Sequence, residues 1–204
     1  MVAVVVLGVI GACSPVSSSR DTSGATSAGP VGATSAGPVG ATSGGTAAGA
    51  SRDAVVATFD GVGRLRAGMR IPEALAALGG TIDTSGGTMP GSICSYARFS
   101  ALPVGTAVML WADTIVRVDV DSVGLRTRWG TGVGSTAAEI RQRHASQEVR
   151  QEPHPYSSPT WHYIVVDPPG DTVHRIILET NEQQRVDSYR VGFRRAVDLV
   201  EGCS

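Results

Sequence analysis

The sequence has no lysine: all 17 of its basic residues are arginine, and 18 acidic residues give the chain a net charge of −1. The arginines are spread along the chain rather than clustered. A protein that binds nucleic acid electrostatically carries a concentrated positive field on one face. The sequence offers no such field, so we expect no nucleic-acid partner.

Large apolar side chains are missing from residues 14–52, which are mostly Ser, Gly, Ala, Thr, Val and Pro and contain no Leu, Ile, Met or aromatic residue. Such a segment cannot bury enough apolar surface to offset the entropy of ordering it. The octapeptide Ala-Thr-Ser-Ala-Gly-Pro-Val-Gly occurs twice in succession, beginning at Ala25 and at Ala33. Residues 14–52 are therefore predicted to be a disordered tether with a span of about 35 Å.

The N-terminus lacks an apolar run of about 20 residues, the length needed to cross a bilayer. The shorter run Val2–Ile10 is typical of a signal-peptide core. It leads into Ile10-Gly11-Ala12-Cys13, which resembles the bacterial lipobox, whose cysteine is lipidated. We predict that residues 1–13 are a lipoprotein signal peptide and that acyl chains such as palmitate on Cys13 hold the protein on a membrane. The expected location is the cell envelope, at the outer membrane facing the periplasm.

No arginine precedes Cys13, whereas a signal peptide normally begins with positive charge. Two interpretations stay open. Either translation starts upstream of Met1, or the chain is a cytoplasmic protein with an apolar N-terminus.

Cysteine is scarce, with three residues in the chain. If Cys13 carries lipid, Cys94 and Cys203 remain, and an exported protein with two remaining cysteines is expected to pair them. The alternative is that Cys94 acts as a nucleophile. The surrounding stretch Ser92–Tyr96 has a strand-like pattern, without the elbow or helix start that activates a cysteine.

Familiar catalytic motifs are also missing, including G-x-S-x-G, the phosphate-binding loop and H-E-x-x-H. His162 and His174 could still face one another across the turn of residues 167–171. With His154 or Glu179 they could form a metal-dependent or hydrolytic site. Their spacing matches no known metal motif. We therefore expect no enzyme activity, no metal and no cofactor, and keep an envelope hydrolase or metal-dependent enzyme as the alternative.

The rest of the chain, residues 53–204, holds every Trp, Tyr and Phe and is long enough for one domain or two small subdomains. Helices are predicted after Gly68, ending at Gly79, and over residues 137–146, with Glu139 completing a capping box. Strand patterns follow each helix. They cover residues 106–111, 115–120, 161–166, 172–180 and 184–193.

A duplicated pattern relates the two parts of this region. The segment that begins at Gly68 aligns with the one at Gly134, Cys94-Ser95-Tyr96 aligns with Trp161-His162-Tyr163, and Arg117-Val118-Asp119 aligns with Arg185-Val186-Asp187. The predicted fold class is α+β. Two tandem repeats, residues 53–122 and 123–204, each place short helices on an antiparallel sheet.

These motifs resemble a known family. Gly68-Met69 followed by Glu73, Leu78 and Gly79, and then an aromatic strand, is similar to the small outer-membrane lipoproteins of the barrel-assembly (SmpA/OmlA) type. Trp161-His162-Tyr163 matches their W-x-Y strand, and Cys94-Ser95-Tyr96 departs from it at the first position. Two such units in tandem resemble the β-lactamase inhibitor protein fold. The resemblance implies a non-enzymatic, protein-binding role.

Strand alternation predicts where a partner would bind. Over residues 115–120, Val116, Val118 and Val120 share one face, and Ile115, Arg117 and Asp119 share the other. The helices are expected to cover the valine face. The opposite face, with Arg117, Asp119, Arg185, Asp187 and Tyr189, is then the predicted surface for an envelope protein partner; the alternative is a merely solvated sheet face.

Overall fold

The computed structural model describes residues 55–85, 92–157 and 159–203, which belong to one compact unit over residues 48–204. The predicted lipidation site Cys13 and the predicted tether, residues 14–52, lie outside the described residues. The fold is α+β, as predicted, and consists mostly of strands with a few short helices. Among the described helices, none is long and apolar enough to cross a membrane.

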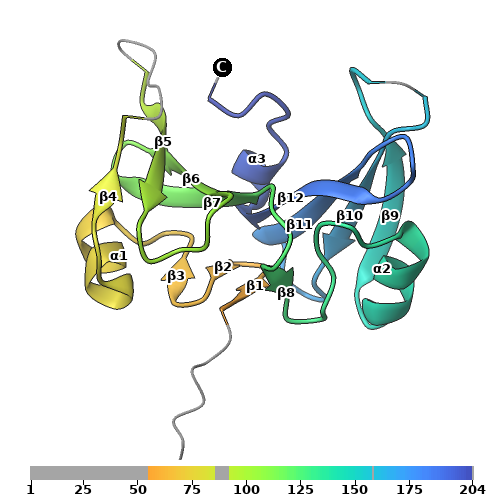
Figure 1. The fold of residues 1–204 in the computed structure, drawn as a ribbon, viewed down its shortest axis with the longest axis horizontal. Helices are drawn as coiled ribbons and strands as arrows, with labels where there is room; N and C mark the ends of the chain where they lie inside the picture. Colours follow the sequence, from red (N-terminus) through yellow and green to blue (C-terminus); the bar gives the residue numbers. More distant parts are fainter. Residues whose placement is uncertain (1–54, 86–91, 158, 204) are drawn as a thin grey trace, which may run out of the picture. The chain divides into compact units, whose positions relative to one another are not determined.

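Eight strands form the large sheet, in the order β4-β5-β6-β7-β12-β11-β10-β9, with every neighbouring pair antiparallel (Figure 1). Its first half is made of β4 (Ile82–Asp83), β5 (Cys94–Phe99), β6 (Thr106–Trp111) and β7 (Thr114–Val120). Its second half is made of β9 (Glu148–Pro153), β10 (His162–Asp167), β11 (His174–Thr180) and β12 (Val186–Phe193). The halves meet where β7 pairs with β12, so the two predicted repeats share one sheet.

The predicted hairpins are present. The β6–β7 turn passes through Ala112, which has a positive φ of 51°, and the β10–β11 turn uses Gly170, with a φ of 75°. The strands themselves are rich in Val and Ile, whose branched side chains suit a pleated surface. Strand β9 was not predicted from the sequence, because its exposed charged residues hide its strand character.

Both predicted helices are present and slightly shorter than expected. Helix α1 (Ile71–Leu78) ends at Gly79, and α2 (Ala137–Arg143) ends at His144. The predicted capping box is confirmed: Glu139 Oε2 accepts from the Thr136 amide at 2.7 Å, and Thr136 Oγ1 accepts from the Glu139 amide at 3.2 Å.

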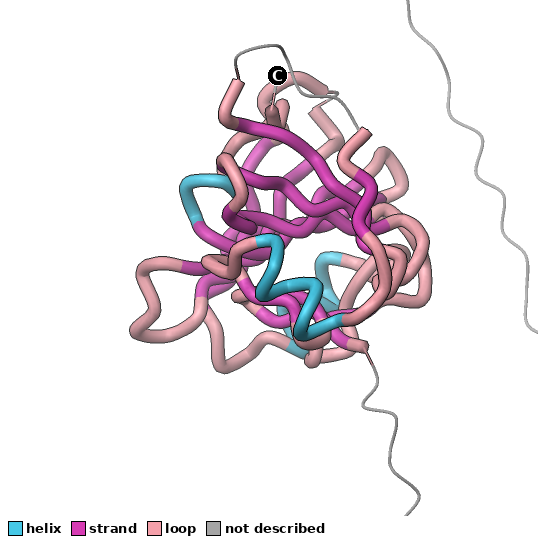
Figure 2. The backbone as a smooth tube through the Cα atoms, turned by 90° about the vertical axis from the view of Figure 1, so that its left-hand side faces the viewer, coloured by secondary structure: helices cyan, strands magenta, loops and turns pink. Residues whose placement is uncertain are grey.

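One face of the large sheet packs on α1, α2 and a small sheet of order β3-β2-β1-β8. The small sheet is formed by β1 (Val56–Thr58), β2 (Gly61–Val62), β3 (Leu65–Arg66) and β8 (Arg126–Thr127). These layers enclose the main core, which includes Leu110, Val118, Ile164 and Leu178. Figure 2 shows α1, nearest the viewer, below the strands.

The other face of the large sheet carries α3 (Arg194–Val197) and the tail that follows it, residues 198–203. In Figure 1, α3 lies above the middle of the sheet, and α1 and α2 lie below it. We call this the α3 face. It is the face on which the sequence analysis predicted partner contacts.

Candidate functional site

The α3 face has two small apolar clusters, one on each half of the sheet. Met109, Val116 and Ala196 form the first, with Tyr96, Trp111, Phe193 and the two cysteines around them. Tyr163, Val165, Ile177 and Val197 form the second. Because Ala196 and Val197 are fully buried, α3 covers the junction between the two halves.

Arg117 lies beneath α3 and its side chain is only 5% exposed. Its Nη1 donates to the carbonyl of Ala196 at 2.9 Å and to that of Leu199 at 2.6 Å. Nη2 donates to the Tyr96 hydroxyl at 3.0 Å, and the guanidinium forms an ion pair with Asp119 at 2.8 Å. The prediction that Arg117 is an exposed partner-binding charge is therefore wrong, because its own chain occupies it.

Arg190 plays a similar part on the other half of the sheet. It is buried, its Nε donates to the carbonyl of Val197 at 2.6 Å, and its guanidinium lies 4.8 Å from the Tyr163 ring centroid. The last carbonyls of a helix lack partners within the helix, and positive charge is favourable near them. Two buried arginines thus bind three carbonyls at the end of α3 and just beyond it.

A disulfide joins the tail to the first half of the sheet. Cys94 and Cys203 are bonded, with their Cα atoms 5.3 Å apart, as predicted. Gly202 has a φ of 65° and lies against the Tyr96 ring, where a larger residue would collide with the phenol. Burial is the main cause that raises the pKa of Tyr96 to about 12, so its hydroxyl stays protonated beneath the tail.

A β-bulge explains why the predicted alternation along β7 was wrong. Leu110 pairs with Ile115, whereas Met109 pairs with Arg117, which leaves Val116 as an extra residue. Ile115 therefore joins the main core, and Val116 lies on the α3 face beside Ala196. Beyond the bulge, the predicted phase holds for Val118 and Val120, which face the core.

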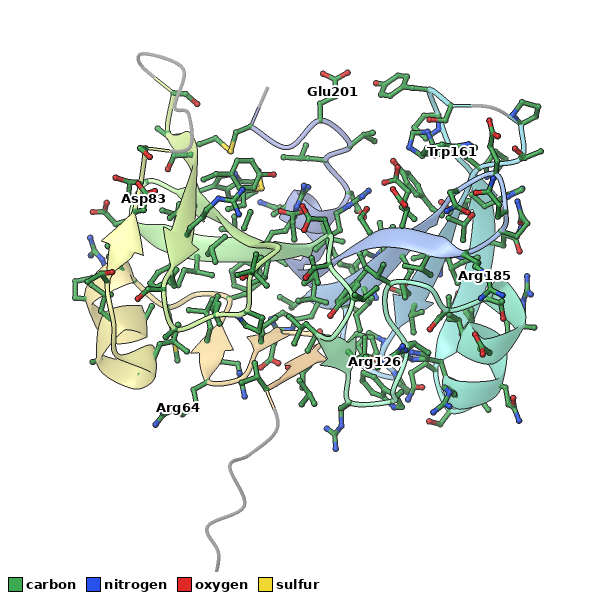
Figure 3. The ribbon with its side chains drawn as sticks, in the orientation of Figure 1. Arg64, Asp83, Arg126, Trp161, Arg185 and Glu201 are labelled. Atoms are coloured by element: carbon green, nitrogen blue, oxygen red, sulfur yellow. A yellow bond between two sulfur atoms is a disulfide. The ribbon has the colours of Figure 1, made fainter. Side chains whose placement is uncertain are left out.

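The structure disperses the other residues predicted to bind a partner. Tyr189 is buried in the main core and its hydroxyl donates to the carbonyl of Leu125 at 3.0 Å, so its predicted outward position is wrong. Arg185 lies beside α2 and donates to the carbonyl of Gly134 at 2.9 Å (Figure 3). Asp187 is exposed at the bulge of β12, and Asp119 is bound to Arg117.

The three histidines predicted as a possible cluster do not come together. His162 and His174 lie at opposite ends of the paired strands, since His162 pairs with Thr180 and His174 pairs with Phe193. His154 Nδ1 accepts from the Tyr156 and Ser157 amides, and its Nε2 lies 3.0 Å from Glu179 and 3.1 Å from the Tyr163 hydroxyl. Within the described residues, no group of His, Cys, Asp and Glu could hold a metal ion.

Three hollows lie across the strands, and the last of them reaches Asp198, just after α3. Cavities of about 320, 100 and 380 Å³ follow one another across the strands. The first two share Ala107 and Asp119, and the last two share Arg190. The result is a shallow trough over both halves of the sheet, with Tyr96 lining its first cavity and Tyr163 its last.

Exposed apolar side chains surround the α3 face. Ile93 is 73% exposed beside Cys94, and Leu199, which is 41% exposed, follows α3. Tyr156 is 71% exposed, and its amide binds His154 against the Tyr163 ring. We call Ile93, Tyr156 and Leu199 the apolar rim of the α3 face.

Comparisons with protein-family models, curated proteins and solved structures find no match to this chain. The geometry of the α3 face therefore carries the functional argument.

Proposed function

We propose that this chain is a cell-envelope lipoprotein, lipidated at Cys13, whose folded unit binds a protein partner through the α3 face. The role is non-enzymatic, and the partner is another envelope protein. The tether over residues 14–52 spans the distance between the lipid anchor and the folded unit. The likeness to barrel-assembly lipoproteins and to the β-lactamase inhibitor protein fold is part of the same proposal.

The observation that carries this proposal is the apolar rim of the α3 face. Ile93 precedes Cys94, Leu199 follows α3, and Tyr156 binds His154, so each exposed side chain lies next to a residue of the α3 face. Exposed apolar side chains that gather beside polar hollows are typical of surfaces that bind proteins. The sheet beneath is rigid, and the disulfide and the two buried arginines hold the tail in place, so the surface is already organised before a partner arrives.

We also propose that the two halves of the fold are tandem repeats, and their hydrogen bonds support this. The Gly68 amide donates to the carbonyl of Ile115, and the Gly134 amide donates to that of Val186, each at 2.8 Å. In each strand a bulge follows this carbonyl, with Val116 as the extra residue in β7 and Asp187 in β12. Each half of the fold thus contains the same glycine-to-strand contact beside a bulge.

The pairing of the strands sets the correspondence between the repeats. Tyr96 is opposite Met109 and Tyr163 is opposite Glu179, and both of these partners come just before a bulge. This supports the match of Tyr96 with Tyr163 made from the sequence. If Ile115 corresponds to Val186, however, Val118 corresponds to Tyr189, so the aligned Arg-Val-Asp motifs are not equivalent.

An affinity capture from envelope extract tests the binding role. The bait is the full-length lipoprotein with a tag inserted in the tether, so that the tail on the α3 face stays unmodified. Ile93→Glu and Tyr156→Glu place a charge on opposite sides of α3, and each is expected to weaken capture of a specific partner. Both side chains are exposed, so neither change should unfold the protein.

Val55→Glu is the matched control, because Val55 is exposed next to the small sheet on the other side of the molecule. Capture by this variant should equal that by the wild type. Equal capture by all three variants, or equal loss in all three, would contradict a partner-binding α3 face.

A further inference from the structure

A separate groove of about 610 Å³ lies at one end of the α3 face, where α3 begins. Its walls come from the β6–β7 turn, the loop before β11, the end of β12 and the start of α3. The lining residues are Trp111, Thr114, Val116, Thr172, Val173, Phe193, Arg194 and Arg195. This volume lies within the range of about 300–1,000 Å³ that is usual for ligand sites.

Ordinary features of the fold build this groove. Trp111 and Thr114 form the last pair of the β6–β7 hairpin, and the bulge in β7 directs Val116 to the same side. Phe193 ends β12 and stacks on His174, with ring centroids 5.3 Å apart. The Arg194 amide donates to the carbonyl of Val173 at 2.8 Å, which fastens the start of α3 to the opposite wall. The aromatic walls are therefore fixed in place before any ligand binds.

The charges of the groove have one sign. Its lining includes two arginines and no acidic residue. Arg194 is already engaged, because its Nη2 lies 3.1 Å from Asp167 and 3.0 Å from the carbonyl of Asp171. Arg195 is exposed and forms no ion pair within the part of the chain that the structure describes. An available guanidinium thus stands beside an apolar cleft.

We propose that this groove binds a short acidic peptide segment of the partner. An apolar side chain of that segment enters between Trp111 and Phe193, and a neighbouring carboxylate pairs with Arg195. The Thr114 and Thr172 hydroxyls, on opposite sides of the groove, can hydrogen-bond a peptide backbone, which favours a peptide over a lipid acyl chain. This inference rests on the proposed protein-binding function and names the chemistry of the bound segment.

Three acetylated, amidated tetrapeptides test the inference on the full-length protein in detergent. Glu-Leu-Phe-Asp carries both features, Lys-Leu-Phe-Lys reverses the charge, and Glu-Gly-Gly-Asp lacks the apolar side chains. The first peptide should bind and shift the Trp111 indole NMR signal, and the other two should bind at least about tenfold more weakly. Equal binding of the acidic and basic peptides would overturn the charge assignment.

Variants locate the site. Arg195→Glu should weaken binding of Glu-Leu-Phe-Asp at least about tenfold, which corresponds to 1.4 kcal/mol, and Arg195→Lys should retain most of it. Arg64→Glu is the matched control, because Arg64 is also exposed and lies far from α3 in Figure 3. Unchanged binding by Arg195→Glu would refute the proposed site.

Decanoate and phosphatidylglycerol vesicles test the alternative ligand class. If they shift the Trp111 signal and the acidic peptide does not, the groove binds lipid and the inference is wrong. The capture experiment is independent of this result. A partner lost on Ile93→Glu, together with no peptide binding, would leave the proposed function standing and remove only the groove assignment.

Discussion

Arg117 and Ala196 are 79 residues apart in the chain, yet the guanidinium of one donates a 2.9 Å hydrogen bond to the carbonyl of the other. The same guanidinium forms an ion pair with Asp119 and a hydrogen bond with Tyr96. It therefore connects β5 and β7 of the first half-sheet with the C-terminal segment. The arginine on which the sequence analysis centred a partner-binding surface instead organises that surface from below.

Replacing this arginine should destabilise the fold. Arg117→Met keeps most of the side-chain volume but leaves Asp119 and two carbonyls without their donor. Breaking a buried ion pair by removing one partner costs about 3–5 kcal/mol. Urea denaturation should show a loss of this size. Arg195→Met, an exposed control, should change the free energy of unfolding by less than about 0.5 kcal/mol.

The disulfide should contribute stability mainly by restricting the unfolded chain. Cys94 and Cys203 close a loop with a sequence separation of 109. The chain-entropy model gives about 4.7 kcal/mol for a loop of roughly 100 residues, and measured losses are typically about 2–4 kcal/mol. Cys94→Ser should lower the free energy of unfolding by this smaller amount and speed hydrogen exchange in residues 194–203. Dithiothreitol should destabilise the wild type and leave Cys94→Ser unchanged.

The bulge in β7 depends on a glycine in the neighbouring strand. Gly192 has a φ of 138°, and a Cβ there would lie 2.9 Å from the Arg117 Cα and even closer to the Val116 carbonyl. Both neighbours are backbone atoms, so they cannot rotate away. Gly192→Ala should therefore lower the free energy of unfolding by more than about 2 kcal/mol.

Gly170→Ala provides the comparison for the Gly192 prediction. Gly170 also has a positive φ, of 75°, but an added Cβ there meets nothing within 4 Å. This change should cost only about 1 kcal/mol, the penalty for the backbone conformation alone. Equal losses of unfolding free energy in the two variants would mean that the close approach of β7 and β12 adds no cost to a side chain at residue 192.

These same features mark the limit of the sequence analysis. Helix caps, hairpin turns and the cysteine pair depend on residues close in sequence or on residue counts, and the structure contains them as predicted. The bulge at Val116 depends on the pairing partner Met109, so a strict two-residue period assigned the wrong side chain to the core. The position of α3 depends on Arg117, which is 79 residues from Ala196 in the chain, and on Arg190 of the preceding strand. The helix itself has four residues, too few to carry a helical pattern. The prediction of the Cys94–Cys203 bond was the one sequence signal that the tail returns to this face.

Stability should fall in mildly acidic solution because of His144. This residue is fully buried at the end of α2, its Nε2 lies 2.9 Å from the Thr131 hydroxyl, and its ring centroid lies 4.8 Å from that of Trp129. Burial lowers the pKa of His144 from 6.5 to about 4. In the unfolded chain the imidazole has its ordinary pKa and takes up a proton as the pH falls below about 6.5. In the folded protein the imidazole stays neutral until the pH falls to about 4.

Between these two pKa values the unfolded state binds more protons, so the stabilisation is complete above about pH 6.5 and is lost as the pH falls toward 4. From pH 7.5 to pH 5 the loss should be about 2 kcal/mol. His144→Gln should be less stable at pH 7.5 and should lack most of this pH dependence. An unchanged pH dependence in the variant would assign it to other groups.

Lipidation at Cys13 is the prediction on which the proposed location depends. Ile10-Gly11-Ala12-Cys13 resembles a lipobox, and Cys13 lies outside the described residues, so chemistry must test it. Mass spectrometry of the membrane fraction should show a chain that begins at residue 13 with a diacylated cysteine. Cys13→Ala should abolish labelling by palmitate and release the protein from the membrane, since two acyl chains are what give stable anchoring.

The Cys94–Cys203 bond gives a second readout of the location, because disulfides persist in the oxidising envelope and are rare in the cytosol. In cells, Cys94 and Cys203 of the wild type should resist alkylation, because their sulfur atoms are bonded to each other. A soluble product that retains Met1 and has both thiols free would place the protein in the cytosol and refute both the anchor and the envelope partner.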